Sequence, residues 1–189
     1  MKQQIREEIL QKRKNLSKEE VNIKSKPIKE NFYSLGCFKK AKNILFYVSY
    51  GNEADTQNII GELLEKKDKK ILIPYIMEDN PILQVSEIKD FNDLEPKAFG
   101  ILETKENKIN NFNPDDIDLI IIPGIAFDRN GHRIGHGNGY YDKFLSSLKR
   151  NPVKIALAFD FQIVDKIDNE EHDVPIDIII TEKEIIHCK

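Results

Sequence analysis

Residue types suited to binding a phosphate gather in one stretch of the sequence, residues 123–142. Five of the nine glycines of the chain lie there, with cationic, histidine, tyrosine and carboxylate side chains around them. These residues are Gly124, Gly131, Gly135, Gly137, Gly139, Arg129, His132, Arg133, His136, Tyr140, Tyr141 and Asp142. An apolar run, residues 118–122, precedes the stretch and a helical pattern, residues 140–148, follows it, which is typical of a strand–loop–helix connection. Glycines let a ligand approach the backbone and a helix N-terminus presents free N–H groups, so the loop predicts an anion site, with a tight structural turn as the alternative.

The roles of single side chains in this stretch stay open on chemistry alone. The glycine spacing matches neither the dinucleotide-binding Gly-x-Gly-x-x-Gly motif nor a P-loop. Asp142 lies in the first turn of the predicted helix and is either a capping carboxylate or a Mg²⁺ ligand, to which the segment 172–177, with its two aspartates, could add a second carboxylate. Tyr140 and Tyr141 either belong to the core or stack on a flat aromatic ligand, with Phe127 nearby.

Two further parts of the chain contain charges that could reach a ligand. Lys2 and Arg6 are four residues apart and share one face of a predicted helix, residues 2–15, either as a solvated face or as a pair of cations aimed at phosphates. Glu53 follows a buried strand, residues 43–48, and ligands bind at the carboxyl ends of strands in open α/β sheets. A lone loop glutamate is more often simply solvated. Together these residues predict a nucleotide or phosphometabolite enzyme that uses Mg²⁺.

The composition limits the class of protein. The chain has 189 residues, of which 40% are hydrophobic and 32% charged, so it can form one domain with a sizeable core. Its net charge of −3 argues against general nucleic-acid binding. No apolar run approaches a membrane span and the N-terminus lacks the apolar core of a signal peptide, so we expect a cytoplasmic protein without a membrane partner. Cys37 and Cys188 predict reduced thiols, and a zinc site is disfavoured because His132, His136 and His172 have no further ligand at the required spacing.

The order of the predicted elements indicates the fold. Apolar runs predict strands at residues 43–48, 70–74, 82–86, 118–122, 153–158, 176–180 and 184–187, and helical periodicity predicts helices at 2–15, 17–35, 56–67 and 140–149. Pro27 predicts a break or kink in the second helix, and Gly36 predicts its end. Residues 87–116 show no clear period and predict an irregular connection. We expect an α/β fold, a three-layer α/β/α sandwich with a mostly parallel central sheet and leading N-terminal helices.

The glycine-rich stretch also resembles a family signature. It reads Pro-Gly-Ile-Ala-Phe-Asp and then Gly-His-Arg-Ile-Gly-His-Gly-Asn-Gly-Tyr-Tyr-Asp. This is similar to Pro-Gly-x-Ala-Phe-Asp and Gly-x-Arg-Leu-Gly-x-Gly-x-Gly-Tyr-Tyr-Asp in the 5-formyltetrahydrofolate cyclo-ligases, also called methenyltetrahydrofolate synthetases. Residues 2–6, 47–56, 70–74 and 99–103 resemble other parts of that family, so we expect a single cyclo-ligase domain over residues 1–189. Ile134 stands where the family commonly has Leu, and Thr104 where it often has Pro.

The resemblance implies a reaction. It is the ATP- and Mg²⁺-dependent cyclisation of 5-formyltetrahydrofolate to 5,10-methenyltetrahydrofolate, a step of one-carbon metabolism that releases ADP and phosphate through a phosphorylated formyl (iminium phosphate) intermediate. Such a transfer depends on positioning and charge neutralisation more than on covalent help from the protein. The expected partners are ATP and the folate, the expected state is a monomer, and no nucleic acid is expected. The rival hypotheses are an ATP-independent sugar-phosphate isomerase or transferase and a non-catalytic nucleotide- or folate-binding module.

The same resemblance implies roles for individual residues. Arg133 is the expected catalytic residue, and Asp142 and Asp173 are expected to hold Mg²⁺. ATP is expected to bind Lys2, Gln3, Gln4, Ile5, Arg6, Arg133, Ile134, Gly135, His136, Gly137, Asn138, Gly139, Tyr140 and Tyr141. The folate is expected to bind Val48, Glu53, Phe127, His136, Gly137, Asn138, Gly139 and Tyr140. A binding-only protein need not keep the whole charged set of Lys2, Arg6, Glu53, Arg133, Asp142 and Asp173.

Overall fold

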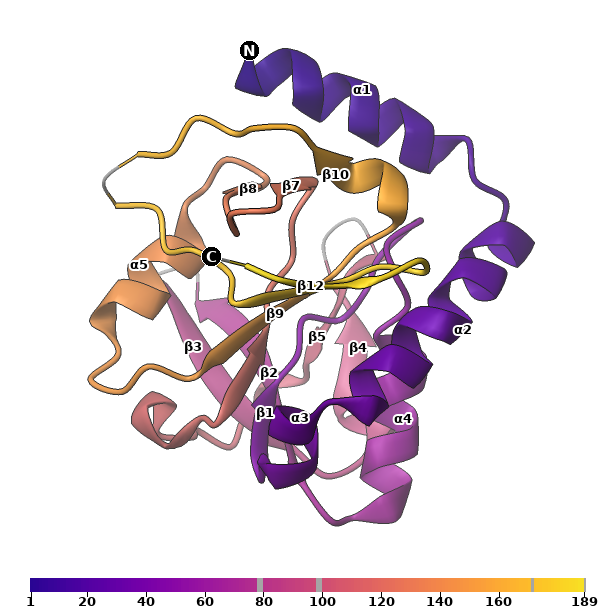
Figure 1. Cartoon of the computed structure of the whole chain (residues 1–189). Helices are drawn as coiled ribbons and strands as arrows, with labels where there is room; N and C mark the ends of the chain where they lie inside the picture. The colour runs from indigo at the N-terminus through magenta and orange to yellow at the C-terminus, as the bar shows by residue number, and fades with distance from the viewer. Residues whose placement is uncertain (78–79, 98–99, 171, 189) are drawn as a thin grey trace.

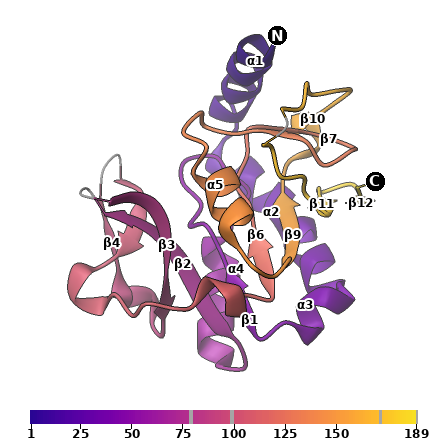
Figure 2. The same cartoon turned by 90° about the vertical axis from the view of Figure 1, so that its left-hand side faces the viewer.

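A seven-stranded sheet runs through the middle of the molecule (Figures 1 and 2). The computed structural model describes residues 1–77, 80–97, 100–170 and 172–188. The strand order is β12-β11-β9-β6-β1-β2-β3. The five inner strands, from β11 to β2, are parallel, whereas β12 and β3 run antiparallel at the two edges. The bounds are β1 (Asn43–Leu45), β2 (Lys70–Met77), β3 (Asn80–Ile88), β6 (Leu119–Ile121), β9 (Val153–Leu157), β11 (Ile178–Ile180) and β12 (Ile185–His187).

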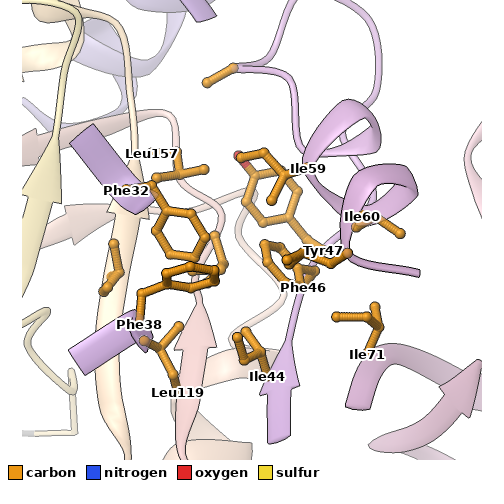
Figure 3. Packing of buried hydrophobic residues seen from close by; sticks show 14 of the residues in the cluster. Phe32, Phe38, Ile44, Phe46, Tyr47, Ile59, Ile60, Ile71, Leu119 and Leu157 are labelled. Atoms are coloured by element: carbon orange, nitrogen blue, oxygen red, sulfur yellow. The ribbon is translucent and has the colours of Figure 1, made fainter. Parts of the chain in front are cut away.

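Helices cover both faces of this sheet. Their bounds are α1 (Lys2–Lys14), α2 (Lys18–Ser34), α3 (Gly36–Lys40), α4 (Gln57–Lys66) and α5 (Tyr140–Ser147), with short 3₁₀ turns η1 (Phe91–Asp93), η3 (Glu106–Lys108), η4 (Pro114–Asp116) and η5 (Asp160–Gln162). Buried side chains from α2, α3 and α4 pack on one face, where Phe32, Phe38 and Ile59 meet Ile44 and Phe46 (Figure 3). Phe144 and Leu145 of α5 pack on the other face against a separate cluster that includes Leu45. The adjacent residues Ile44 and Leu45 thus point to opposite faces, as strand geometry requires. The expected three-layer α/β/α sandwich with a mostly parallel sheet is confirmed.

Two small sheets lie beside the central one. The first has the order β10-β7-β8 and consists of β7 (Ala126–Asp128), β8 (Arg133–Ile134) and β10 (Ile163–Val164). The helix α1 packs over it through Ile5 and Ile9, at the end of the molecule where the N-terminus lies (Figure 1). The second is the antiparallel pair β4 (Leu94–Pro96) and β5 (Leu102–Thr104). The described residues within 87–116 therefore include a strand pair where an irregular connection was predicted, and Phe99, part of the family resemblance, lies outside the described residues.

The second helix contains no break at Pro27, whereas the predicted kink stays untested. The helix α2 runs without a break from Lys18 to Ser34 with Pro27 inside it. A proline in a helix interior costs roughly 3 kcal/mol, so other contacts must hold the helix together. Ile28 and Phe32 are fully buried beside Pro27, and the Ser25 hydroxyl accepts a hydrogen bond from the Asp55 amide at 3.1 Å. Tertiary packing therefore outweighs the local penalty.

The ends of two elements also differ from the prediction. Gly36 does not cap the end of α2 but opens α3, because Leu35 between them is extended. The ladder of β1 ends at Leu45, three residues before the predicted end, although the Phe46 amide still donates to the Leu72 carbonyl at 2.9 Å. The remaining apolar residues, 46–48, are buried as the start of a loop. Within the described part of the chain, no helix has the length and apolar character needed to cross a membrane.

Candidate active site

Two hollows open near the carboxyl ends of the parallel strands. One has a volume of about 260 Å³ and is lined mainly by polar residues, and we call it the polar hollow. Its lining residues are Lys2, Arg6, His132, Arg133, Ile134, Gly135, Gly137, Gly139, Asp142, Glu170, His172, Asp173, Val174 and Pro175. The other, the apolar hollow, has a volume of about 330 Å³. It is lined by Tyr47, Val48, Tyr50, Glu53, Ile73, Pro74, Tyr75, Ile76, Leu83, Ile101, Leu102, Glu103, Pro123, His136, Tyr140 and Tyr141.

The glycine-rich segment 135–139 lies between the two hollows. A smaller cavity of about 230 Å³ over this segment is lined by residues of both hollows, such as Arg133 and Asp142 from the polar one and Tyr140 and Tyr141 from the apolar one. Groups bound in the two hollows would therefore meet at this segment.

The two cations from the N-terminal helix reach the polar hollow. The Lys2 ammonium lies 2.9 Å from the Glu170 carboxylate and 3.7 Å from that of Asp173. The hydrogen bond to Glu170 raises the pKa of Lys2, so its charge is secure at neutral pH. The Arg6 Nε donates to the Gly135 carbonyl at 3.3 Å. The fold turns both residues toward the glycine-rich segment, and their contact with phosphates stays a prediction.

The remaining N-terminal residues of the predicted ATP set lie in different environments. Gln3 bonds to Arg6 and Glu7 on the same helix, Gln4 is exposed, and Ile5 packs in the small cluster under α1. Their contact with ATP stays a prediction.

Arg133 and Asp142 form the most buried ion pair in the polar hollow. The Arg133 Nη2 lies 2.7 Å from Asp142 Oδ1, and its side chain is only 6% exposed. The Arg133 Nη1 also donates to the Val174 carbonyl at 2.8 Å, while the Val174 amide donates to Asp142 Oδ1 at 3.1 Å. This closed set of bonds joins β8, α5 and the segment before β11. It fixes the guanidinium by its geometry and leaves it little freedom to reorient.

The carboxylates of the polar hollow are suited to a magnesium ion that is coordinated partly by the protein and partly by a bound phosphate. No group of three or more His, Cys, Asp or Glu residues that could hold a metal by itself occurs among the described residues. Mg²⁺ usually takes only one or two carboxylates together with phosphate oxygens and water, so such a group is not required. Asp142 and Asp173 line the same hollow as Lys2 and Arg6, and both hydrogen bonds to Asp142 end on Oδ1. The donor set is therefore compatible with Mg²⁺ that arrives with a phosphate.

The glycines of residues 123–142 divide into two groups. Gly131 lies in the turn between β7 and β8, where its φ is +88° and an added Cβ would come within 2.3 Å of the Ile176 carbonyl. Its role is structural. At Gly135, Gly137 and Gly139 an added Cβ would meet nothing within 4 Å, so these three face open space. Gly139, with φ of +64°, is also the N-cap of α5. The stretch is thus a hairpin, to which the interpretation as a tight turn applies, followed by an open glycine segment, where the anion site stays a prediction.

Glu53 lies in the wall of the apolar hollow and is not a solvated loop residue. Its side chain is only 13% exposed. Its Oε2 accepts a hydrogen bond from the Tyr50 amide at 2.9 Å, and its Oε1 lies 3.4 Å from Arg13 Nη2 and 3.8 Å from His136 Nε2. A carboxylate held in this way is available to pair with N–H groups of a ligand in the hollow.

Among the predicted folate contacts, Phe127 occupies a different place from the others. Val48 and Tyr140 line the apolar hollow together with Glu53. Phe127 is fully buried, and its ring lies so close to Gly124 that an added Cβ there would come within 2.5 Å of it. The side chain therefore supports the site from beneath and lines neither hollow as the structure stands.

Sequence analysis did not single out several residues of the site. Tyr75 and Ile76 on β2 line the apolar hollow, and Glu170 pairs with Lys2 in the polar one. These three had no local signal, because only the tertiary fold brings them there. Arg13, which contacts Glu53, did have a local signal. It lies seven residues after Arg6 and therefore on the same face of the helix as Arg6.

Comparisons with known proteins agree with this geometry. Residues 1–182 match the model of the 5-formyltetrahydrofolate cyclo-ligase family. The chain is 30% identical to the 5-formyltetrahydrofolate cyclo-ligase of Haemophilus influenzae, over 95% of this chain and 97% of that one. It is 33% identical to the mitochondrial cyclo-ligase of Arabidopsis thaliana, over 79% of this chain but only 62% of that longer protein. The solution structure of Aquifex aeolicus 5,10-methenyltetrahydrofolate synthetase is similar with a TM-score of 0.86 at 34% identity, covering 100% of this chain and 93% of that one. The resemblance predicted from the sequence is confirmed, and the chain belongs to the 5-formyltetrahydrofolate cyclo-ligase family of ligases.

Proposed function

We propose that this protein uses ATP and Mg²⁺ to close 5-formyltetrahydrofolate into 5,10-methenyltetrahydrofolate, releasing ADP and phosphate. The observation that supports this most is that a polar hollow lined by three cations and three carboxylates and an apolar hollow containing a fixed carboxylate meet at one open glycine segment, 135–139. A reaction between a nucleotide phosphate and a large aromatic substrate needs this arrangement, because the two reacting groups must lie side by side.

The polar hollow is assigned to the triphosphate of ATP. Lys2, Arg6 and Arg133 supply positive charge there, and the open backbone at Gly135 and Gly137 leaves room for phosphate oxygens. Phosphate groups bind readily at such glycine segments at a helix N-terminus, here that of α5. Arg133 is the residue assigned to the charge that develops on the transferring phosphoryl group.

Mg²⁺ is assigned to Asp142 and Asp173, which would hold it together with phosphate oxygens. The ion, when bound, would neutralise charge on the β- and γ-phosphates. The Arg133–Asp142 pair brings one proposed metal ligand and one proposed phosphate ligand into contact at 2.7 Å. Both groups would therefore act on neighbouring parts of the triphosphate.

The apolar hollow is assigned to the folate. Its aromatic residues, among them Tyr47, Tyr75 and Tyr140, suit a flat ring system. Glu53 would accept N–H groups of the pterin ring, which is a charge-assisted and therefore strong type of hydrogen bond. In this arrangement the formyl group would lie toward His136 and the glycine segment, close to the γ-phosphate.

The reaction then follows in two displacements. The formyl oxygen attacks the γ-phosphorus, the bond from that phosphorus to the bridging oxygen breaks, and ADP leaves. The resulting iminium phosphate is attacked at the formyl carbon by N10 of the folate, which loses its proton. The C–O bond then breaks and phosphate leaves with the former formyl oxygen, giving the methenyl ring. The protein's part is to hold both substrates, neutralise charge and limit access of water to the intermediate.

The rival hypotheses are less consistent with the geometry. An ATP-independent sugar-phosphate isomerase would have no use for Lys2 and Arg6 beside the glycine segment, nor for an aromatic hollow of about 330 Å³. A non-catalytic binding module would not need Arg133 and Asp142 at the junction of the hollows. The proposed enzyme is a monomeric, single-domain protein over residues 1–189 with two small-molecule substrates. Cys37 and Cys188 are free thiols, which supports a reducing compartment such as the cytoplasm.

The experiment that tests this function combines the purified protein with 5-formyltetrahydrofolate, ATP and MgCl₂ and follows the near-ultraviolet absorbance of the methenyl product. We expect an absorbance rise that disappears when ATP is omitted or when Mg²⁺ is removed with EDTA. A sample with ADP in place of ATP is the matched control. A rise that is independent of ATP, or no rise at all, would overturn the proposal.

A further inference from the structure

Arg13 is a buried cation whose charge has little compensation. The residue is only 8% exposed, and its closest carboxylate contact is the 3.4 Å approach of Nη2 to Glu53 Oε1. Two further guanidinium nitrogens, Nε and Nη1, are buried without a hydrogen-bond partner among the described residues. Burying a charged group without hydrogen-bond partners costs free energy, so we expect Arg13 to have a role beyond packing.

The location of Arg13 links it to both hollows. On α1, the residues Lys2, Arg6, Ile9 and Arg13 follow spacings of four, three and four, so they lie on one face of the helix. Lys2 and Arg6 reach the polar hollow, Ile9 packs on the small sheet, and Arg13 reaches the wall of the apolar hollow. One rigid helix thus contributes to the boundaries of both sites.

The loop that contains Glu53 is attached to the same helix by a second contact. The Asn52 side-chain amide donates to the carbonyls of Arg13 and Leu16, each at 2.8 Å. Asn52 precedes Glu53, so the backbone of the loop and the carboxylate are both held against the C-terminal end of α1. The Tyr50 amide fixes the other carboxylate oxygen at 2.9 Å. Glu53 is therefore held from two sides, by its own loop and by Arg13.

We propose that Arg13 is a positioning residue that orients the Glu53 carboxylate toward the pterin ring of the folate. The inference rests on the proposed function, since it assigns Glu53 to the folate. The Arg13 charge attracts Oε1 and the Tyr50 amide binds Oε2, so the carboxylate presents one fixed orientation to the apolar hollow. Without Arg13, the nearest nitrogen of a basic side chain to Oε1 is His136 Nε2, at 3.8 Å, which contacts Glu53 from the glycine segment. The carboxylate would then turn toward that segment and lose its alignment with the ring.

The test compares Arg13→Met and Arg13→Lys with Lys12→Met, a matched control on the same helix whose exposed side chain pairs with Glu8. KM values for the folate and for ATP are measured separately, with thermal unfolding to check the fold. We expect Arg13→Met to raise the folate KM about tenfold or more, the loss of one charge-assisted contact, with the ATP KM within about twofold of the wild type. Arg13→Lys should restore part of the folate affinity, and Lys12→Met should match the wild type.

A double-mutant cycle with Glu53→Gln separates positioning from a structural role. We expect Arg13→Met to add almost nothing to the folate KM once Glu53 is changed, because both substitutions remove the same oriented carboxylate. Additive effects, or an equal rise of both KM values in step with lower thermal stability, would show that Arg13 only supports the fold. If Arg13→Met does not fold, Arg13→Gln, which removes the charge but keeps a polar side chain, decides: a raised folate KM with an unchanged ATP KM supports the proposal and a wild-type folate KM overturns it. Absence of ATP-dependent turnover in the wild type would instead refute the proposed function, so the two failures are distinguishable.

Discussion

Arg133 and Asp142, a proposed phosphate ligand and a proposed metal ligand, are bound to each other at 2.7 Å and share Val174 as a backbone partner. Each side chain fixes the other before any ligand arrives. Pre-organised charges of this kind stabilise a transition state without having to rearrange during the reaction. The pair also joins the small sheet to α5.

Asp142→Ala should abolish turnover while leaving the fold intact. The substitution removes the proposed Mg²⁺ ligand and frees Arg133 to move, so we expect kcat to fall by about 100-fold or more, a typical cost of removing one pre-organised electrostatic group. Circular dichroism should match the wild type. Lys143→Ala, which changes the next, exposed residue of α5, is the control. Wild-type activity in Asp142→Ala would refute the magnesium assignment.

Arg6→Lys should weaken the binding of ATP more than the binding of folate. Arg6 binds the Gly135 carbonyl through Nε at 3.3 Å, a bond that lysine cannot make while also reaching a phosphate. We expect the ATP KM to rise about tenfold, the equivalent of one charge-assisted hydrogen bond, with the folate KM nearly unchanged. Initial rates at varied ATP and at varied folate measure this separation. Equal changes in both constants would indicate that α1 has shifted as a whole.

Gly135→Ala should change ATP binding without changing stability, whereas Gly131→Ala should lower stability. Gly135 has an ordinary φ and open space at the Cβ position, so alanine should leave the thermal midpoint unchanged but raise the ATP KM by intruding where phosphates would lie. Gly131→Ala should destabilise the protein severely, because its Cβ would overlap the Ile176 carbonyl at a φ of +88°. Thermal unfolding combined with ATP kinetics distinguishes the two. A stable Gly131→Ala variant would contradict this division of the glycines.

Asp128 should contribute to stability in a manner that depends on pH. Burial alone would raise the pKa of this fully buried carboxyl, but hydrogen bonds from the amides of Ile167, His132 and Asn130 and from the His132 ring lower the pKa overall. A lowered pKa means stability that is present above the ordinary value of 3.8 and is lost as the pH falls through the folded value.

We therefore expect Asp128→Asn to cost about 2–4 kcal/mol at neutral pH, because the amide keeps only one acceptor for several buried donors. Chemical denaturation at neutral pH measures this cost. Repeating it below pH 4 should show a smaller difference between the two proteins. A difference that does not change with pH would mean that the Asp128 charge is not the source of the stability.

The architecture could be predicted because the inner strands lie within continuous apolar runs. A continuous apolar run is typical of a strand in the middle of a parallel sheet. Two such runs, residues 118–122 and 153–158, both lie there. The strands β7 and β8 could not be predicted, because short runs among glycines have no usable period. The break at Pro27 was predicted from local propensity alone. The helix continues through Pro27 because the burial of Ile28 and Phe32 outweighs that propensity.

The residues of the candidate site could be predicted where they lie on one segment of the sequence. They could not be predicted where the fold brings distant segments together. Arg133 and Asp142 stand out in the sequence, but their mutual ion pair and its link to Val174 depend on the packing of α5 against β8. Phe127 has the residue type of a ligand contact, yet the sequence does not show that it lies under Gly124. Burial of a single side chain depends on all of its neighbours, which no local pattern specifies.

The central claim is that ATP activates the folate by phosphorylating its formyl oxygen. The most direct measurement uses 5-formyltetrahydrofolate labelled with ¹⁸O in the formyl group and analyses the released inorganic phosphate by mass spectrometry or by the ³¹P isotope shift. The account predicts one ¹⁸O atom in each phosphate released, with one methenyl product formed for each ATP consumed. Unlabelled phosphate, or label found only in water, would contradict it.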